Sequence, residues 1–84
     1  MTGEEFRKTR EWFDLGRDEF ALLIGYVGSD RNNNFRIRKM EKEEEISLPI
    51  ARLLWLIAKH KTATGELPHW PAHLRIEGET EPWK

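Results

Sequence analysis

The spacing of apolar residues predicts a protein built from helices. The strongest helical periodicity lies near the middle of the chain, where apolar side chains recur at intervals of three and four residues: Ile50, Leu53, Leu54, Ile57 and Ala58. Pro49 is suited to a first helical turn, and Lys59 to Lys61 complement the dipole of a helix end. This segment therefore predicts a helix that opens at residues 47–49 and ends near residue 61.

Two shorter helices are predicted before it. Thr2 and Glu5 have the spacing of a capping box, so the first helix should start near Gly3 and bury a stripe of Phe6 and Phe13 together with Trp12. The break at residues 14–16 separates it from a second helix. That helix is expected to bury Phe20, Leu23 and Ile24 and to end at Gly25, where glycine suits a C-cap.

A third helix is predicted within the segment that runs to residue 41, and two starting positions are possible for it. Ser29 or Asp30 is a suitable N-cap, which places the start at Asp30. The three asparagines at 32–34 are poor interior residues, which places the start only after Asn33. In either case Ile37 and Met40 should face inward. The acidic run at 41–45 is expected to be a solvated helix end or loop.

Residues 62–84 differ in character from the rest. Pro68, Pro71, Pro82 and two glycines prevent a long helix, and residues 74–77 alternate in the manner of a short strand. The tryptophans of this segment suggest that parts of it dock on the helical body, and the alternative is a partly disordered tail. We therefore predict an all-α fold, a compact bundle of four to five helices over residues 1–61, with a Pro-rich extension over 62–84 that serves in dimerisation.

Length and composition narrow the function. Eighty-four residues allow one domain, and the absence of cysteine excludes disulfides and thiolate zinc sites. His69 and His73 are four residues apart, but Pro68 and Pro71 disfavour a helix there and a third ligand is lacking, so no metal or cofactor is expected. No nucleophile or phosphate-loop motif predicts an enzyme. Short apolar runs and the lack of a signal pattern predict a cytoplasmic protein without a membrane span.

Charge is distributed unevenly. The chain as a whole has a net charge of −1, yet residues 26–42 carry five basic and two acidic side chains. The same segment holds the three asparagines. A local basic patch matters more than the total charge when the partner is a polyanion. The pattern indicates a nucleic-acid contact surface, and its alternative is an ordinary solvated helix face.

Three segments follow one another in a characteristic order: residues 15–25 (LGRDEFALLIG), residues 37–41 (IRKME) and residues 46–56 (ISLPIARLLWL). Through them, residues 6–60 resemble the Cro/repressor-like (Xre-type) helix-turn-helix regulators. The first segment is similar to the family's second helix in register, the second to its pattern of apolar and polar residues ending in glutamate, and the third to the loop and helix that follow. The segment Leu67 to Pro71 is similar to one found in short regulators of bacterial mobile elements and phages. The chain departs from the family pattern in having about five additional residues between Gly25 and Ile37, and Arg17 where glutamine is usual.

This resemblance implies a transcriptional regulator, expected to be a repressor, that binds a palindromic DNA operator. Arginine pairs with guanine and asparagine with adenine in the major groove. The side chains expected to contact bases are Asn33, Asn34, Arg36 and Lys39 in the first rank and Arg31 and Asn32 in the second. Arg17 and Arg38 should contact phosphates. The alternative for the asparagines is a capping and turn cluster.

Self-association is predicted from the apolar surface left over. Trp55 and Leu56 lie beside the buried stripe of the fourth helix, and Leu74 and Ile76 lie on the strand-like segment of the tail, so these four residues are expected to form a homodimer interface. No small-molecule ligand is evident. The competing function is a protein-binding module of the same fold, such as an antitoxin or antiactivator, which the net acidity and four tryptophans favour.

Overall fold

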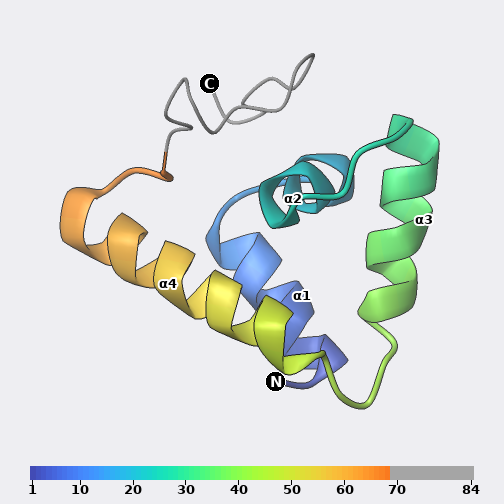
Figure 1. Cartoon of the computed structure of the whole chain (residues 1–84), viewed down its shortest axis with the longest axis horizontal. Coiled ribbons are helices and arrows are strands. Elements are labelled where there is room, and N and C mark those ends of the chain that lie inside the picture. The colour runs from blue at the N-terminus through green and yellow to red at the C-terminus, as the bar shows by residue number, and fades with distance from the viewer. Residues whose placement is uncertain (69–84) are drawn as a thin grey trace.

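The computed structural model describes residues 1–68, and the regular structure in this range is entirely helical. Helix α1 spans Gly3–Trp12, α2 spans Arg17–Ile24, α3 spans Asp30–Met40 and α4 spans Leu48–Thr64. Figure 1 shows α1 and α2 lying between α3 on one side and α4 on the other. The all-α prediction is confirmed for this range.

The helix boundaries follow from local capping. The Thr2 hydroxyl accepts a hydrogen bond from the Glu5 amide (3.1 Å), and the Glu5 carboxylate accepts one from the Thr2 amide (2.9 Å), which is the predicted capping box. That second bond lowers the pKa of Glu5 below its ordinary value. Helix α2 ends at Gly25, whose φ of 110° is a left-handed conformation that glycine adopts without steric cost.

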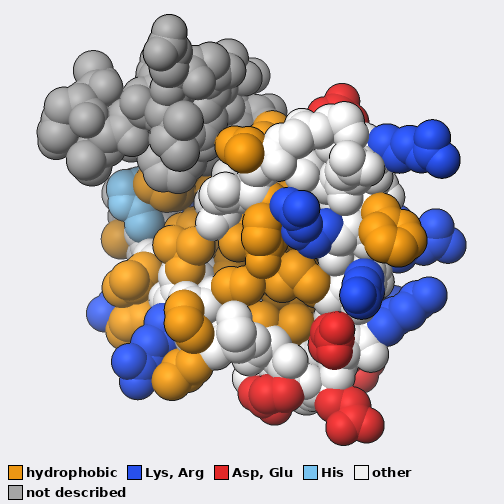
Figure 2. Space-filling model, turned by 45° about the vertical axis from the view of Figure 1, so that its right-hand side comes forward, with side chains coloured by type: hydrophobic (Ala, Val, Ile, Leu, Met, Phe, Trp, Pro, Cys, Tyr) orange, Lys and Arg blue, Asp and Glu red, His pale blue; other side chains and the backbone are white. Residues whose placement is uncertain are grey.

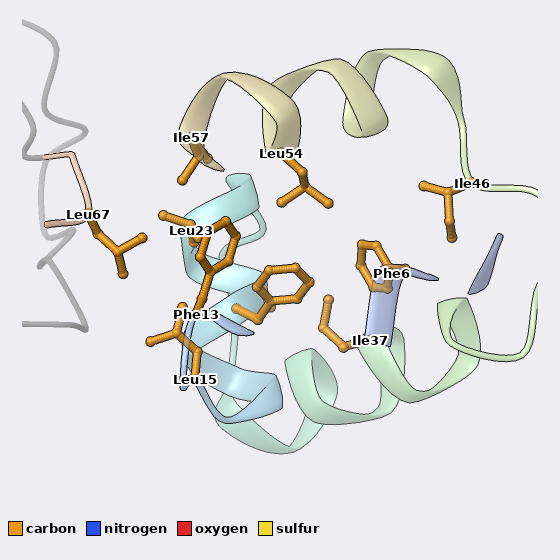
Figure 3. Packing of buried hydrophobic residues seen from close by; sticks show 11 residues of the cluster. Phe6, Phe13, Leu15, Leu23, Ile37, Ile46, Leu54, Ile57 and Leu67 are labelled. Carbon is orange, nitrogen blue, oxygen red and sulfur yellow. The ribbon is translucent and has the colours of Figure 1, made fainter. Parts of the chain in front are cut away.

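One hydrophobic core joins all four helices (Figure 3). The rings of Phe6 and Phe20 lie 5.0 Å apart between centroids, and Ile37 from α3 and Leu54 from α4 belong to the same buried cluster. The buried apolar residues are Phe6, Phe13, Leu15, Phe20, Ala21, Leu23, Ile37, Ile46, Leu54, Ile57 and Leu67. The predicted inward faces of α2 and α4 are therefore confirmed, with Ile24, Leu53 and Ala58 partly buried.

Trp12 differs from the prediction. Its side chain is 52% exposed, because it lies about 100° around α1 from the neighbouring Phe13, which takes the buried position. Lys61 of α4 covers the indole instead: its Nζ lies 4.9 Å from the Trp12 ring centroid and donates to the Trp12 carbonyl at 3.1 Å. The placement of Trp12 on the core stripe was thus wrong, and the residue forms a contact at the surface between α1 and α4.

The start of the chain is bound to the loop between α3 and α4. The Gly3 amide donates to the Glu43 carbonyl at 3.0 Å, and the Ile46 amide donates to the Met1 carbonyl at 2.8 Å. A Cβ atom at Gly3 would lie 2.6 Å from the carbonyl oxygens of Glu41 and Glu43, so only glycine fits this approach. These contacts fix the loop, and with it the separation of α3 from α4.

The helical body extends past the predicted boundary at residue 61. Helix α4 continues to Thr64, and beyond it the side chain of Leu67 is buried in the core. The predicted strand at 74–77, its interface residues Leu74 and Ile76, and the histidines at 69 and 73 lie outside the described residues.

Candidate nucleic-acid interface on α3

Helix α3 is held against α2 by a short connection and a defined start. Residues 25–29 join the two helices, and the Ser29 hydroxyl accepts from the Asn32 amide at 3.2 Å. Of the two predicted starts, the structure has the earlier one, at Asp30. Ile37 is buried and Met40 partly buried, as expected, so these side chains fix which face of α3 meets solvent.

The solvent-facing side of α3 combines cations, amides and one aromatic ring. Its exposed residues are the acidic Asp30 at the first position, followed by Arg31, Asn32, Asn34, Phe35, Arg36, Arg38 and Lys39. From Arg31 to Met40 the helix contains no acidic residue. Figure 2 shows Lys and Arg side chains gathered along the right-hand edge of the molecule, the side on which α3 lies. This face concentrates positive charge and hydrogen-bond donors on one regular element.

Asn33 does not belong to this face. Its side chain is 1% exposed, and neither its amide nitrogen nor its carbonyl oxygen has a hydrogen-bond partner within the described residues. Asn33 lies four residues before Ile37 and therefore on the same inward side of the helix. The expectation that Asn33 contacts a base is corrected: the side chain faces the interior and cannot reach a partner outside the molecule.

Arg36 lies at one flank of the exposed face. Its guanidinium carbon is 4.5 Å from the centroid of the Tyr26 ring, a cation–π contact. The hollow between α3 and the start of α4 is lined by Tyr26, Arg36, Lys39, Met40 and Ile50, among others. Arg36 is thus exposed, as predicted, but directed toward α4, whereas Arg31 and Arg38 line a hollow near the start of α2.

Arg17 lies at the start of α2 and is engaged by Glu41. The Arg17 Nε donates to one carboxylate oxygen of Glu41 at 3.2 Å, and the Nε of Arg10 donates to the other at 2.9 Å. The Glu41 side chain is 7% exposed, so this carboxylate is enclosed by two cations from different helices. Arg17 itself is about one third exposed, and its guanidinium is held at the edge of the α3 face.

Glu41 is the residue that sequence reasoning missed. The sequence predicts that residues 41–45 are solvated, as a helix end or a loop. This prediction is wrong for the Glu41 side chain, which is 7% exposed. The available signal was helical spacing, because Glu41 follows Ile37 by four residues and continues the inward side of α3. Its negative charge is paired with Arg10 and Arg17 and is not left unpaired beside the α3 face.

Helix α4 exposes a second surface of different character. Trp55 is 59% exposed and Leu56 nearly as much, and Leu48 at the start of the helix is exposed to a similar degree. Lys59 Nζ lies 4.8 Å from the Trp55 ring centroid. Both predicted interface residues of α4 are therefore accessible.

Comparison with known proteins adds no relative. No family model, no curated protein and no solved structure matches this chain. Among residues 1–68 no group of His, Cys, Asp and Glu side chains is arranged to hold a metal ion. In the same range no helix combines the length and apolar character needed to cross a bilayer.

Proposed function

We propose that this protein binds double-stranded DNA through a helix-turn-helix formed by α2, residues 25–29 and α3. The observation that carries the proposal is the exposed side of α3, which offers cationic and amide groups along three turns without an intervening acid. An α-helix fits the width of the B-DNA major groove, and arginine, lysine and asparagine match the acceptors and donors of base edges there.

The side chains divide into two roles. Asn34 and Lys39 project from the exposed side of α3 and are assigned to base edges, with Arg31, Asn32 and Arg36 at its ends and flank. Arg17 and Arg38 are assigned to phosphates, which set the position of the helix in the groove. Glu41 supports this role for Arg17, because it holds the Arg17 Nε and leaves the terminal guanidinium nitrogens to reach a phosphate.

One such module contacts few base pairs, so we propose that the protein acts as a homodimer on a palindromic operator. The accessible Trp55 and Leu56 of α4 supply an apolar surface for the second copy. Two copies related by a two-fold axis place their α3 helices in successive major grooves, about one helical turn apart. Occupancy of such a site suffices for repression of an adjacent promoter.

The test is DNA selection followed by salt titration. Duplexes that the wild-type protein retains from a random-sequence pool should bind with an affinity that falls linearly in logarithm with the logarithm of salt concentration. Arg38→Ala should weaken binding to all sequences and reduce the slope by about one. Lys8→Ala is the control, since Lys8 is an exposed cation on α1, outside α3 and outside the proposed dimer surface, and its loss removes the same charge.

Equal effects of the two substitutions would show that α3 has no special role. Absence of a selected sequence would favour the second candidate function, a protein-binding module of the antitoxin or antiactivator kind. The observation that favours this candidate is the apolar surface of Trp55, Leu56 and Leu48, beside the hollow between α3 and α4. Such a protein would bind its partner without a specific DNA site.

A further inference from the structure

Phe35 occupies an unusual place for an aromatic residue. It is 70% exposed, the highest value among the large apolar side chains of residues 1–68 that remain at the surface. Transfer of a phenylalanine ring out of water is strongly favourable, so a partner that covers the exposed ring would gain binding free energy. The ring lies on α3, the helix proposed to enter DNA.

The neighbours of Phe35 define what it meets. Arg31 and Lys39 lie one turn before and after it, and Arg38 three residues after it, all exposed. Because residues three and four apart share a helix face, Phe35 lies among these cations, and the hollow that it lines with Arg31 and Arg38 also contains Asp18 and Asp30 at one end. Any polyanion that docks on these cations is brought against the ring.

We infer that Phe35 contacts the C5-methyl group of a thymine in the major groove. This inference rests on the proposed function. The base edges in the groove present hydrogen-bond donors and acceptors except at thymine, whose methyl group is apolar, and phenylalanine is a side chain that packs on it. The ring therefore selects a T·A pair at one position of each half-site. The polar side chains beside Phe35 cannot make this selection, because they do not recognise an apolar methyl group.

Uracil substitution isolates this contact. In a duplex selected by the wild-type protein, each thymine is replaced in turn by deoxyuridine, which removes only the methyl group. At one thymine per half-site the wild-type affinity should fall about four-fold, the value of one methyl group at about 0.8 kcal/mol. Phe35→Ala should bind the thymine duplex at least about four-fold more weakly and should not respond to uracil at that position.

Two further variants define the result. Phe35→Leu keeps an apolar contact and should retain part of the preference for thymine. Val27→Ala is the control, because Val27 is an exposed apolar residue of the turn before α3, and its substitution should leave the uracil profile unchanged. All three variants should unfold at the wild-type temperature, since neither side chain is in the core.

The failures are distinguishable. If uracil lowers the affinities of wild-type and Phe35→Ala equally at every thymine, or if Phe35→Ala binds as tightly as wild type, the assignment of Phe35 is overturned while DNA binding stands. If the wild-type protein selects no sequence from the random pool, the proposed function fails, and the thymine contact fails with it.

Discussion

Helices α3 and α4 both expose a long side to solvent, and they expose opposite chemistry. The side of α3 carries cations and amides around a single ring, whereas the side of α4 carries Trp55, Leu56 and Leu48 with cations at its margin. Polar groups remain hydrated at little cost, but a cluster of large apolar side chains is poorly solvated and favours association. On this contrast rests our proposal of a polyanion as the partner of α3 and of an apolar partner, a second copy of the chain, for α4.

The largest expected effect comes from a substitution that disturbs the loop between α3 and α4, because this loop keeps the two exposed sides apart. Gly3→Ala places a methyl group against two backbone carbonyl oxygens that cannot rotate away. We expect it to lower the free energy of unfolding by about 3 kcal/mol, as for overpacking of a tight site. Denaturant unfolding measures the change.

Gly16→Ala is the control for that substitution. An added Cβ there meets only the ends of the Asp18 and Glu19 side chains, which can rotate, so the cost should be at most about 1 kcal/mol. Similar losses in the two variants would mean that the approach of Gly3 to the loop does not stabilise the fold.

A smaller effect is expected from Glu41→Gln. The substitution keeps the shape of the side chain but leaves Arg10 and Arg17 facing each other without a counter-charge. We expect a loss of about 2 kcal/mol in the free energy of unfolding, below the value for a fully buried pair because Arg17 reaches solvent.

Glu44→Gln provides the matched comparison, because Glu44 is exposed in the same loop and its substitution should change stability by less than about 0.5 kcal/mol. The measurement is thermal unfolding at low and at high salt. A larger loss of stability in the Glu41 variant than in the Glu44 variant would support a structural role for the bridge. Equal losses would contradict that role.

The smallest effect on stability, and a selective one, is expected from Trp55→Glu. Because Trp55 is mostly exposed, the unfolding temperature should change little. The dissociation constant of the dimer should rise about ten-fold or more, as for loss of a tryptophan at the centre of an interface. Sedimentation at tens of micromolar measures it, with Val27→Glu as a control of equal charge change. A wild-type protein that sediments as a monomer would refute the dimer.

Sequence alone predicted those parts of the fold that depend on local chemistry. The capping box of Thr2 and Glu5, the C-cap at Gly25 and the periodicity of the fourth helix require only neighbouring residues, and each was placed correctly. The exposure of most of the predicted α3 side chains also followed from helical spacing.

The errors concern side chains whose environment is set by distant segments. Asn33 and Glu41 are polar types that composition places at the surface, yet both continue the inward side of α3, where the chain enclosed them. Trp12 is apolar and was placed inside, but Phe13 fills that position. In each case the residue type favoured one environment and the position on the helix favoured the other. The position on the helix decided whether the side chain was buried.

The bridge at Glu41 has a kinetic consequence. Helix α3 is fixed at its start by the Ser29 cap. At its end the Glu41 carboxylate accepts hydrogen bonds from Arg10 of α1 and Arg17 of α2. Fraying from either terminus is therefore opposed, and the amides that donate within α3 should exchange with solvent more slowly than the first-turn amides of Asp30 and Arg31, which have no carbonyl partner in the helix. Under the proposed function, association with DNA then requires no prior ordering of α3, so its rate is governed by diffusion and electrostatic attraction.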